Sequence, residues 1–531
     1  MSVQTPTLRP YSRGPVPIQT AEEAAALDRR AIDDVGVSQP VLMENAGRSA
    51  AMVLGAIHGL PRRVVAVVGS GNNGGDGLVA ARALEAWGCD VRILLVADRP
   101  VGDPLLHGWR LTVLQDSSLS DTDVDALFSW ADVVVDGILG TGARGAPRER
   151  QARVIERLNA SGRPVVSLDV PSGVDATSGR TAGAVVRAAT TVSFGAPKLG
   201  ALLHPARAHV GRHVSVEIGF PPLTESDAAA FAVTPAWARA RIPRRDTDTH
   251  KNRVGRIVVV GGAKGMAGAV ILAARASFRT GAGLVQVASV AENRETIQRA
   301  LPEAIFIDVA DAAELSAALE EADAVAVGPG LGTAGPSADV LLRAVSVGTA
   351  PLLLDADALN LIAAGVVDLA PLSSGRPTLV TPHPGEMARL LEESGKASGS
   401  FAAAASAAEL AREAVRRFGC TVLYKGAPSV VVGPGGVLAV DTQGSSDLAV
   451  AGMGDTLTGV CAALAGQGAD LLTAGALGLY LSGRAAHLAG RGAGLTPSDV
   501  AERIPDALAE RAEPETDLDA PFVFFDADPA R

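Results

Sequence analysis

The sequence predicts two α/β domains in series, each built on a mainly parallel β-sheet covered by helices. Three observations predict this fold class. The chain has 531 residues, more than one core usually serves at roughly 100–200 residues per domain. Short apolar runs alternate with helix-like segments such as GLVAARALEAWG, which is typical of a parallel sheet with crossover helices. The alternation lapses near residues 219–243, where prolines and small polar residues predict a linker.

The individual elements follow from the apolar runs in chain order. In the first half, buried strands are expected at 63–68, 91–96, 132–138, 164–170 and 190–194. After the linker, strands are expected at 256–262, 284–289, 324–330, 351–357, 377–383 and 421–426, and helices near 453–466 and 470–490. The predicted organisation is a flexible leader (1–18), a first domain (19–222), a linker (223–243), a second domain (244–510) and an acidic tail (511–531).

The composition argues against several classes of protein. A net charge of -11 disfavours binding to nucleic-acid phosphate, and an aromatic content of 3% disfavours base-stacking platforms. The chain has no run of about 18 uncharged apolar residues, so no membrane span is predicted. Cys89, Cys420 and Cys461 are scattered without metal-binding spacing, which predicts reduced core thiols and a cytoplasmic location.

The first glycine-rich loop, GSGNNGGDG at 69–77, lies between a predicted strand and a predicted helix. Its Gly-x-Gly-x-x-Gly spacing matches the fingerprint of Rossmann-like domains, in which backbone N–H groups at a helix N-terminus approach phosphate. A structural turn would explain the glycines about as well. It would not explain Asn72, Asn73 and Asp76, whose amide and carboxylate oxygens suit a hard cation.

Further polar side chains follow two later strands of the first half. Asp136 ends the third strand, Asp169 ends the fourth, and Ser172 lies in the next turn. Because ligands bind beyond the carboxyl ends of parallel strands, these side chains and Asn73 are expected around one crevice. Each alone could be a helix cap or a turn residue, but together they predict a site for a nucleotide and a cation.

The motifs GSGNNGGDG, VDGILGTGARG and LDVPSGVDATSG together resemble the NAD(P)H-hydrate epimerase domain, over roughly residues 20–220. The resemblance implies a K⁺ ion held by Asn73, Asp136 and Ser172. It implies that Asp169 binds the substrate, and we expect this carboxylate to provide the acid–base help that epimerisation at C6 needs. The hydrate contacts it implies are Asn72, Asn73, Gly74, Gly75, Asp76, Gly140, Thr141, Gly142, Ala143, Arg144, Gly145, Ala146 and Asp169.

Four stretches of the second half place glycines or polar residues at expected strand ends. They are GGAKGMAGA (261–269), GPGLG (328–332), TPHPGEMARL (381–390) and AVAGMGDTLTGV (449–460). In the last, Gly452 and Gly454 would free the N–H groups of a helix N-terminus to hold an anion. Asp455 could then take a proton from an attacking hydroxyl, although a helix cap is the alternative. Lys425, in LYKGAPSVVV, is placed to meet phosphates.

These motifs resemble the ribokinase-like fold and, more closely, the ADP-dependent NAD(P)H-hydrate dehydratase domain, over roughly residues 240–510. The resemblance implies Asp455 as the catalytic base, ADP as co-substrate and Mg²⁺ at the site. The ADP contacts it implies are Lys425, Gly426, Ala427, Pro428, Ser429 and Gly454, and the hydrate contacts are Ala269, Gly330, His383 and Asp455. Many sugar kinases carry Asn-x-x-Glu where this chain has His383-Pro-Gly-Glu386, which argues against an ordinary sugar kinase.

The two resemblances combine in a bifunctional NAD(P)H-hydrate repair enzyme, an isomerase and a lyase in one chain. Such an enzyme interconverts the R and S hydrates (NADHX and NADPHX) and dehydrates the S epimer while ADP gives AMP and phosphate. A homo-oligomer is also implied. Three alternatives stay open: an ATP-dependent vitamin or sugar kinase with an accessory Rossmann-like domain, a first half that only binds or scaffolds, and a redox dehydrogenase. The sequence does not separate NADH hydrate from NADPH hydrate.

Overall fold

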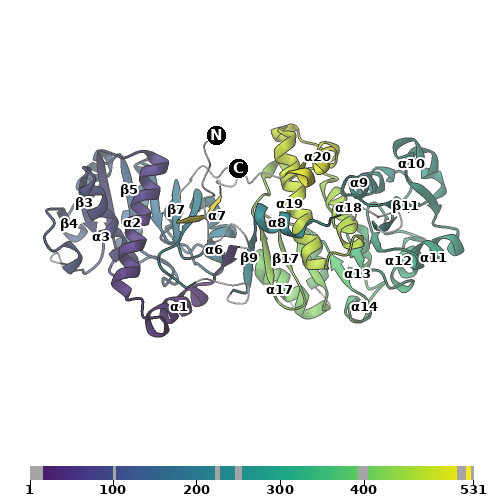
Figure 1. Ribbon diagram of the computed structural model, residues 1–531, viewed down its shortest axis with the longest axis horizontal. Coiled ribbons are helices and arrows are strands. Elements are labelled where there is room, and N and C mark those ends of the chain that lie inside the picture. Colours follow the sequence, from purple (N-terminus) through teal and green to yellow (C-terminus); the bar gives the residue numbers. More distant parts are fainter. Residues whose placement is uncertain are drawn as a thin grey trace, which may run out of the picture. The chain divides into compact units, whose positions relative to one another are not determined.

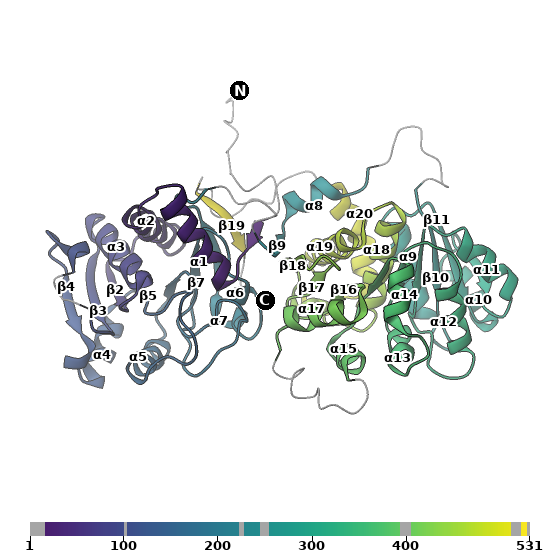
Figure 2. The same ribbon diagram turned by 90° about the horizontal axis from the view of Figure 1, so that it is seen from below.

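The computed structural model divides the chain into two compact units. It describes residues 16–99, 103–221, 228–244, 254–392, 405–510 and 522–527. Unit 1 comprises Met1–Phe231 and Pro514–Arg531, and unit 2 comprises Ala232–Glu513. Each unit has a β-sheet with helices on both faces (Figures 1 and 2). The prediction of two α/β domains is therefore confirmed.

The sheet of unit 1 is parallel except at one edge. Among the described residues it has eight strands, in the order β19-β8-β7-β6-β5-β2-β3-β4, and β19 alone runs antiparallel to its neighbour. The strands are β2 Arg63–Val68, β3 Asp90–Leu95, β4 Thr112–Gln115, β5 Val133–Gly137, β6 Val165–Leu168, β7 Thr190–Phe194, β8 Arg212–Val216 and β19 Val523–Ala527. The helices are α1 Ala21–Arg29, α2 Gln39–His58, α3 Asn72–Ala86, α4 Asp121–Trp130, α5 Glu149–Ala160, α6 Leu199–Leu202 and α7 Arg207–Val210.

The central strand β2 shows why both faces of this sheet are covered. Successive strand side chains point to opposite faces. Val64, Ala66 and Val68 lie in one core with residues of α2 and α3, whereas Val65 and Val67 lie in a second core with residues of α4 and α5. Figure 2 shows these two helix pairs on opposite sides of the sheet. A strand that is apolar throughout, RVVAVV, thus requires a helical layer on each side.

The sheet of unit 2 combines a parallel body with an antiparallel extension. Its order runs β18-β17-β16-β15-β14-β13-β10-β11-β12, antiparallel from β18 to β16 and parallel from there on. The strands are β10 Arg256–Val260, β11 Leu284–Ser289, β12 Ile305–Asp308, β13 Ala324–Val327, β14 Leu352–Leu354, β15 Thr378–Val380, β16 Thr421–Tyr424, β17 Val430–Val432 and β18 Leu438–Asp441. The helices from β10 onward are α9 Ala267–Arg279, α10 Arg294–Ala300, α11 Ala312–Glu320, α12 Ser337–Ser346, α13 Asp357–Ala363, α14 Leu369–Gly375, α15 Pro384–Leu391, α17 Ala407–Phe418, α18 Met453–Gly466, α19 Leu471–Ala489 and α20 Pro497–Ala509.

Every predicted strand is present, but several end two or three residues early. β13 ends at Val327 and β14 at Leu354, where the apolar runs predicted 330 and 357. Gly328 and Ala356 have φ angles of +123° and +49°, so the chain turns out of the sheet at these points. The residues that were assigned to strand ends therefore form the loops that face the candidate sites.

Two regions in which no strand or helix was expected contain regular structure. Within the expected linker, Ala230–Val233 form β9 and Pro235–Arg241 form α8. Within the expected tail, Val523–Ala527 form β19. Most of the expected leader lies outside the described residues, and its last part, Val16–Ile18, is β1.

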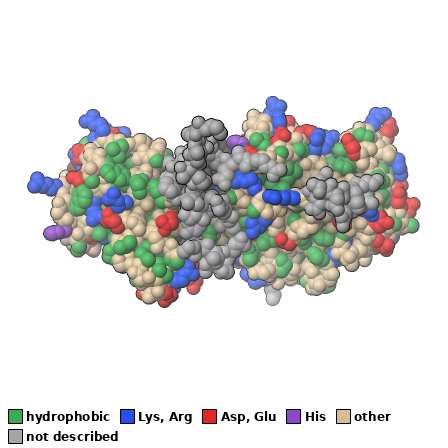
Figure 3. All heavy atoms as spheres, in the orientation of Figure 1, with side chains coloured by type: hydrophobic (Ala, Val, Ile, Leu, Met, Phe, Trp, Pro, Cys, Tyr) green, Lys and Arg blue, Asp and Glu red, His purple; other side chains and the backbone are tan. Residues whose placement is uncertain are grey.

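The surface and the thiols agree with the compositional predictions. On the face shown in Figure 3, acidic and basic side chains are interspersed among hydrophobic and neutral ones. The three cysteines are buried free thiols. In the described part of the chain, no helix combines the length and the apolar character that crossing a bilayer requires.

Candidate active sites

The glycines of the first loop in unit 1 are required because two chain segments approach each other closely there. α3 begins at Asn72, inside this loop. A Cβ on Gly69 would lie 2.0 Å from the carbonyl oxygen of Ile138, and a Cβ on Gly74 would lie 2.1 Å from that of Gly69. A side chain at Gly69 would push the loop away from the segment that follows β5, and a side chain at Gly74 would push the start of α3 away from the loop. The glycines thus bring the N-terminus of α3 against the carboxyl end of the neighbouring strand.

This approach joins Asn73, Asp136 and Ser172 in one hydrogen-bonded network. The buried Asp136 carboxylate accepts hydrogen bonds from the Ser172 hydroxyl at 2.6 Å and from the Ser172 backbone N–H at 3.0 Å. Asn73 Nδ2 donates to the Leu139 carbonyl at 3.0 Å, and the Leu139 N–H donates to the Ser172 hydroxyl oxygen at 2.9 Å. Asn73 Oδ1 is buried and has no hydrogen-bond partner among the described residues.

The chemistry of this network fits a hard cation. An amide oxygen without a donor is a free ligand of the kind that such cations use. Burial raises the pKa of Asp136 in spite of the hydrogen bonds from Ser172 and Ser167, and a cation nearby would stabilise its ionised form. Among the described residues there is no cluster of three or more His, Cys, Asp or Glu side chains suited to a metal. Amide and hydroxyl oxygens would therefore supply most of the ligands.

Asp169, directly after β6, carries the second group of contacts in unit 1. Its φ angle is +65°, in the left-handed region that non-glycine residues rarely adopt. Its Oδ1 lies 2.7 Å from the Lys198 ammonium, and its Oδ2 accepts a hydrogen bond from the Thr141 hydroxyl. Burial opposes ionisation, but the Lys198 charge and these hydrogen bonds outweigh it, so the pKa of Asp169 lies below its ordinary value. Asp169 is ionised at neutral pH.

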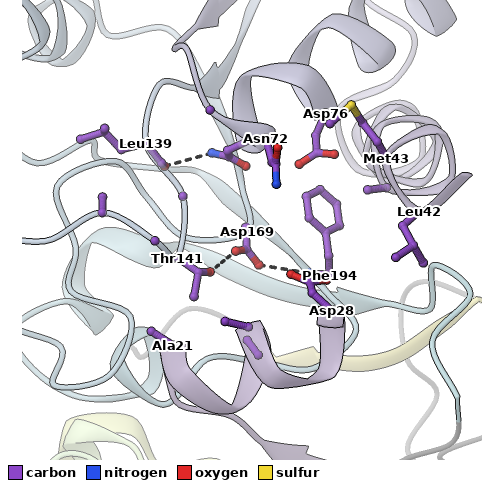
Figure 4. A pocket seen from close by; sticks show the side chains of 18 of the residues that line it. Ala21, Asp28, Leu42, Met43, Asn72, Asp76, Leu139, Thr141, Asp169 and Phe194 are labelled. Carbon is purple, nitrogen blue, oxygen red and sulfur yellow. Dashed lines mark hydrogen bonds between the residues drawn. The ribbon is translucent and has the colours of Figure 1, made fainter. Parts of the chain in front are cut away.

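The same side chains line a cavity of about 490 Å³, a size typical of small-molecule sites. Figure 4 shows Asp169 and Thr141 pointing toward each other, with Asp76 and Phe194 beside the same space. Burial, followed by the charges of Asp169 and Asp28, raises the pKa of Asp76 well above its ordinary value. The cavity thus combines one carboxyl group whose pKa is lowered, Asp169, with two whose pKa values are raised, Asp76 and Asp28.

Most, but not all, of the predicted hydrate contacts lie on this cavity. The lining includes Asn72, Asn73, Asp76, Gly140, Thr141, Gly142, Ala143 and Asp169. Gly74 and Gly75 are buried in α3, and Arg144, Gly145 and Ala146 are exposed; these five are not part of the lining. Sequence reasoning missed Lys198, which is 2% exposed. Lysine is scarce in this arginine-rich chain, and this scarcity is the sequence signal that would have marked Lys198.

In unit 2, Asp355 connects two elements that are distant in sequence. It directly follows β14 and is 1% exposed. Its Oδ1 lies 2.7 Å from the Lys425 ammonium, just after β16, and its Oδ2 accepts a hydrogen bond at 2.8 Å from the Thr458 hydroxyl in α18. Sequence reasoning missed Asp355, although the strand-end rule that found Asp136 applies to it equally.

Asp455 lies in the first turn of α18, beside this pair. Gly452, the N-cap, has a φ angle of +88°, which glycine adopts without strain. A Cβ on Gly454 would lie 3.1 Å from Lys425 Nζ, so two predicted ADP contacts adjoin. Burial, assisted by the Asp355 charge and opposed by Lys425, raises the pKa of Asp455 to about 6. A carboxylate with this pKa is suited to accept a proton near neutral pH.

The other predicted contacts of unit 2 form two neighbouring groups. A Cβ on Gly330 would lie 3.1 Å from Ala269 Cβ, so these two predicted hydrate contacts adjoin. His383 is the N-cap of α15, where its Nδ1 accepts a hydrogen bond from the Gly385 N–H at 3.0 Å. Glu386, in the same helix, has its Oε2 4.0 Å from Lys425 Nζ. The α15 N-terminus thus adjoins the Asp355–Lys425 pair.

Comparison with known proteins matches both halves of the chain. The family described as NAD(P)H-hydrate dehydratase matches residues 257–506, and the family described as YjeF-related protein N-terminus matches residues 39–200. A bifunctional NAD(P)H-hydrate repair enzyme from Moorella thermoacetica is 37% identical over 478 residues, 84% of this chain and 87% of that protein. One from Escherichia coli is 34% identical over 84% of each chain. An ADP/ATP-dependent NAD(P)H-hydrate dehydratase from Bacillus subtilis, co-crystallized with ATP/Mg²⁺, is 25% identical over 52% of this chain and 96% of its own, with a TM-score of 0.44.

Proposed function

Since this chain belongs to the family of bifunctional NAD(P)H-hydrate repair enzymes, we propose that its two units perform the two successive repair steps. Unit 1 interconverts the R and S epimers of hydrated NADH or NADPH. Unit 2 dehydrates the S epimer while ADP is converted to AMP and phosphate. The observation that carries the proposal is an aspartate of shifted pKa at the strand ends of each unit, Asp169 in unit 1 and Asp455 in unit 2.

In unit 1, two of the three carboxyl groups that line the cavity, Asp169 and Asp76, suit a reversible ring opening. C6 of the hydrate carries both the added hydroxyl and the bond to the ring nitrogen N1. Opening the C6–N1 bond requires a base for the hydroxyl proton and an acid that protonates N1, and reclosure on the other face of the carbonyl gives the other epimer. The pKa of Asp169 lies below its ordinary value and the pKa of Asp76 lies well above it, so we assign Asp169 as the base and Asp76 as the acid.

A K⁺ ion in unit 1 would be held by Asn73, Asp136 and Ser172. The unpaired Asn73 Oδ1 and the buried Asp136 carboxylate support this assignment. When bound, the ion would supply positive charge for the phosphates or the polar ring of the substrate at the start of α3. The chain's own residues perform the proton transfers.

In unit 2, Asp455 accepts the proton of the C6 hydroxyl as this oxygen takes the terminal phosphoryl group of ADP. AMP leaves, the ring nitrogen then expels phosphate from C6, and loss of a proton from C5 restores the C5=C6 bond. Lys425 and the N–H groups around Gly454 bind the phosphates. Mg²⁺ would accompany the nucleotide, because this metal is usually held by substrate phosphates and one or two carboxylates; Glu386 is available beside Lys425.

The test is the absorbance at 340 nm of a mixed R/S hydrate preparation with the protein, Mg²⁺ and K⁺, with and without ADP. Complete ADP-dependent recovery of NADH is expected. Recovery that stops at the S fraction would refute the function of unit 1. Accumulation of a phosphorylated product without recovery of NADH would favour the alternative of an ATP-dependent small-molecule kinase.

Replacing K⁺ by N-methylglucamine is expected to slow the conversion of R to S hydrate by about tenfold to a hundredfold, the range of activity lost when a metal site is weakened. The rate of S-hydrate dehydration should change much less. The measurement is chromatography of the two epimers, started from pure R hydrate. An unchanged rate in buffer freed of K⁺ by a cryptand would remove the ion from the assignment.

The pH profile of dehydration should report the ionisation of Asp455. Its pKa is about 6, and a base acts only when deprotonated, so kcat/KM for the S hydrate should rise with pH through about 6. Asp355→Asn removes a negative charge that raises the pKa of Asp455, so the acid limb should move to lower pH. Asp506→Asn, an exposed carboxylate paired with Arg503, is the control. Identical acid limbs in Asp355→Asn and the wild type would contradict this electrostatic coupling.

A further inference from the structure

The strand β19 completes the sheet of unit 1 from the far end of the chain. It runs antiparallel to β8, with Asp526 opposite Val214 and Ala527 opposite His213. The Asp526 carboxylate forms two hydrogen bonds with the Arg212 guanidinium, at 2.7 and 2.9 Å. Phe525 is 6% exposed. β19 therefore covers an edge that would otherwise present unpaired backbone groups to solvent.

β19 also covers a buried histidine of β8. The rings of Phe525 and His213 meet edge to face, with centroids 5.4 Å apart and planes at 81°, a favoured aromatic geometry. His213 is 3% exposed. Burial, followed by the charges of Lys198 and Arg207 and opposed by Asp169, lowers the pKa of His213 to about 3. The imidazole is therefore neutral at physiological pH.

A directed chain of hydrogen bonds leads from His213 to Asp169. The Ser193 hydroxyl donates to the Asp169 carbonyl oxygen at 2.7 Å, and His213 Nε2 lies 2.8 Å from the same hydroxyl oxygen. A serine hydroxyl has one proton, which it gives to Asp169, so His213 Nε2 must be the protonated nitrogen and donate to Ser193. His213 Nδ1 has no partner among the described residues, in agreement with this tautomer.

The backbone of Asp169 needs this support. An aspartate at φ +65° is held in a sparsely populated conformation, which persists where the surroundings determine it. Both backbone polar groups of Asp169 are bound by β7: its N–H donates to the Val192 carbonyl at 2.7 Å, and its carbonyl accepts from Ser193. In this backbone conformation the Asp169 side chain faces Thr141 and Lys198.

We propose that Phe525, His213 and Ser193 are positioning residues for Asp169, so that the last strand of the chain is required for epimerisation although it follows the dehydratase unit in sequence. This inference rests on the function proposed for unit 1. The two activities should therefore be separable by deletion: loss of residues 514–531 should stop epimerisation and leave dehydration of the S hydrate intact.

The first test uses a matched pair at His213, because the truncation alone could unfold unit 1. His213→Phe retains a ring against Phe525 but removes the donor to Ser193, whereas His213→Gln retains an N–H donor. Starting from pure R hydrate without ADP, His213→Phe should lower the epimerase kcat about tenfold or more with KM within about twofold, because small displacements of a catalytic group slow the chemical step. His213→Gln should restore most of the rate. Equal rates for the two variants would overturn the inference.

The second test is a pH profile that a purely structural role of β19 would not move. Phe525→Ala admits water to His213, whose pKa should return toward about 6.5. The imidazolium would then face the charges of Lys198 and Arg207, which repel it, and that of Asp169, which attracts it. This attraction would draw the ring away from Ser193 and Phe525. The acid limb of epimerisation by this variant should therefore lie at higher pH than that of the wild type, and Phe525→Leu should restore the wild-type profile.

The outcomes distinguish the inference from the function on which it rests. A wild-type chain that leaves R hydrate unconverted would overturn the function of unit 1 and this inference with it. A chain that lacks residues 514–531 and converts R hydrate at the wild-type rate would overturn the inference alone. Loss of dehydration in the truncated chain would also contradict it, because the two activities would then not be separable.

Discussion

Replacing Asp455 by asparagine is expected to lower ADP-dependent dehydration of the S hydrate by about a thousandfold, within the range that a positioned base contributes. Asparagine keeps the volume of the side chain but cannot accept the hydroxyl proton. Asp455 is only half-buried, so the thermal midpoint should change little. Conversion of R to S hydrate should continue at the wild-type rate.

The measurement is recovery of absorbance at 340 nm from pure S hydrate with saturating ADP and Mg²⁺. Asp506→Asn, in the neighbouring helix α20 and exposed, is the matched control and should be fully active. An Asp455→Asn protein with more than a few per cent of wild-type kcat would exclude Asp455 as the base. Such a result would shift attention to Glu386, the other carboxyl group of raised pKa beside Lys425.

The second large effect is expected at Asp169. Asp169→Asn should reduce R-to-S conversion by about a hundredfold or more, with dehydration of S hydrate unchanged. This variant leaves the Lys198 ammonium buried without its counter-ion, and breaking a buried ion pair typically costs about 3–5 kcal/mol. Loss of activity could therefore follow from unfolding of unit 1 rather than from loss of the base.

A double variant removes this ambiguity. Asp169→Asn combined with Lys198→Met eliminates both charges, and we expect the thermal stability of unit 1 to return toward that of the wild type while epimerisation stays absent. Asp125→Asn, an exposed carboxylate paired with Arg157, is the control for a charge change in unit 1. A stable double variant that still epimerises would remove Asp169 from the mechanism.

The parts of the fold that local sequence determines were predictable. Apolar runs such as RVVAVV showed the buried strands, and the glycine loops showed where strands end and helices begin. Asn73, Asp136, Asp169 and Ser172 were found by one rule, that polar residues at the carboxyl ends of parallel strands meet, and the structure brings them around one region of unit 1.

What escaped prediction depends on contacts between residues far apart in the chain. Lys198 and Asp355 each had a sequence signal, but no local pattern identifies the residues with which they pair, because the pairing depends on the finished fold. The short strand β19 carries a mixed pattern, VFFDA, at the end of an acidic segment. Its pairing with β8 is set by the register of the finished sheet rather than by its own composition.

The membership of β19 in the sheet of unit 1 has a consequence for how the chain is made. Arg212 and its partner Asp526 are 314 positions apart, and everything between them must be synthesised before they can meet. The first domain to leave the ribosome is thus the last to acquire its complete set of strands. A contact of such long range closes late and slowly, and until then the β8 edge, with His213 behind it, is uncovered. Maturation of the epimerase site therefore waits until the segment that follows the second domain has been synthesised, and dehydration can begin in a chain whose first domain is still unfinished.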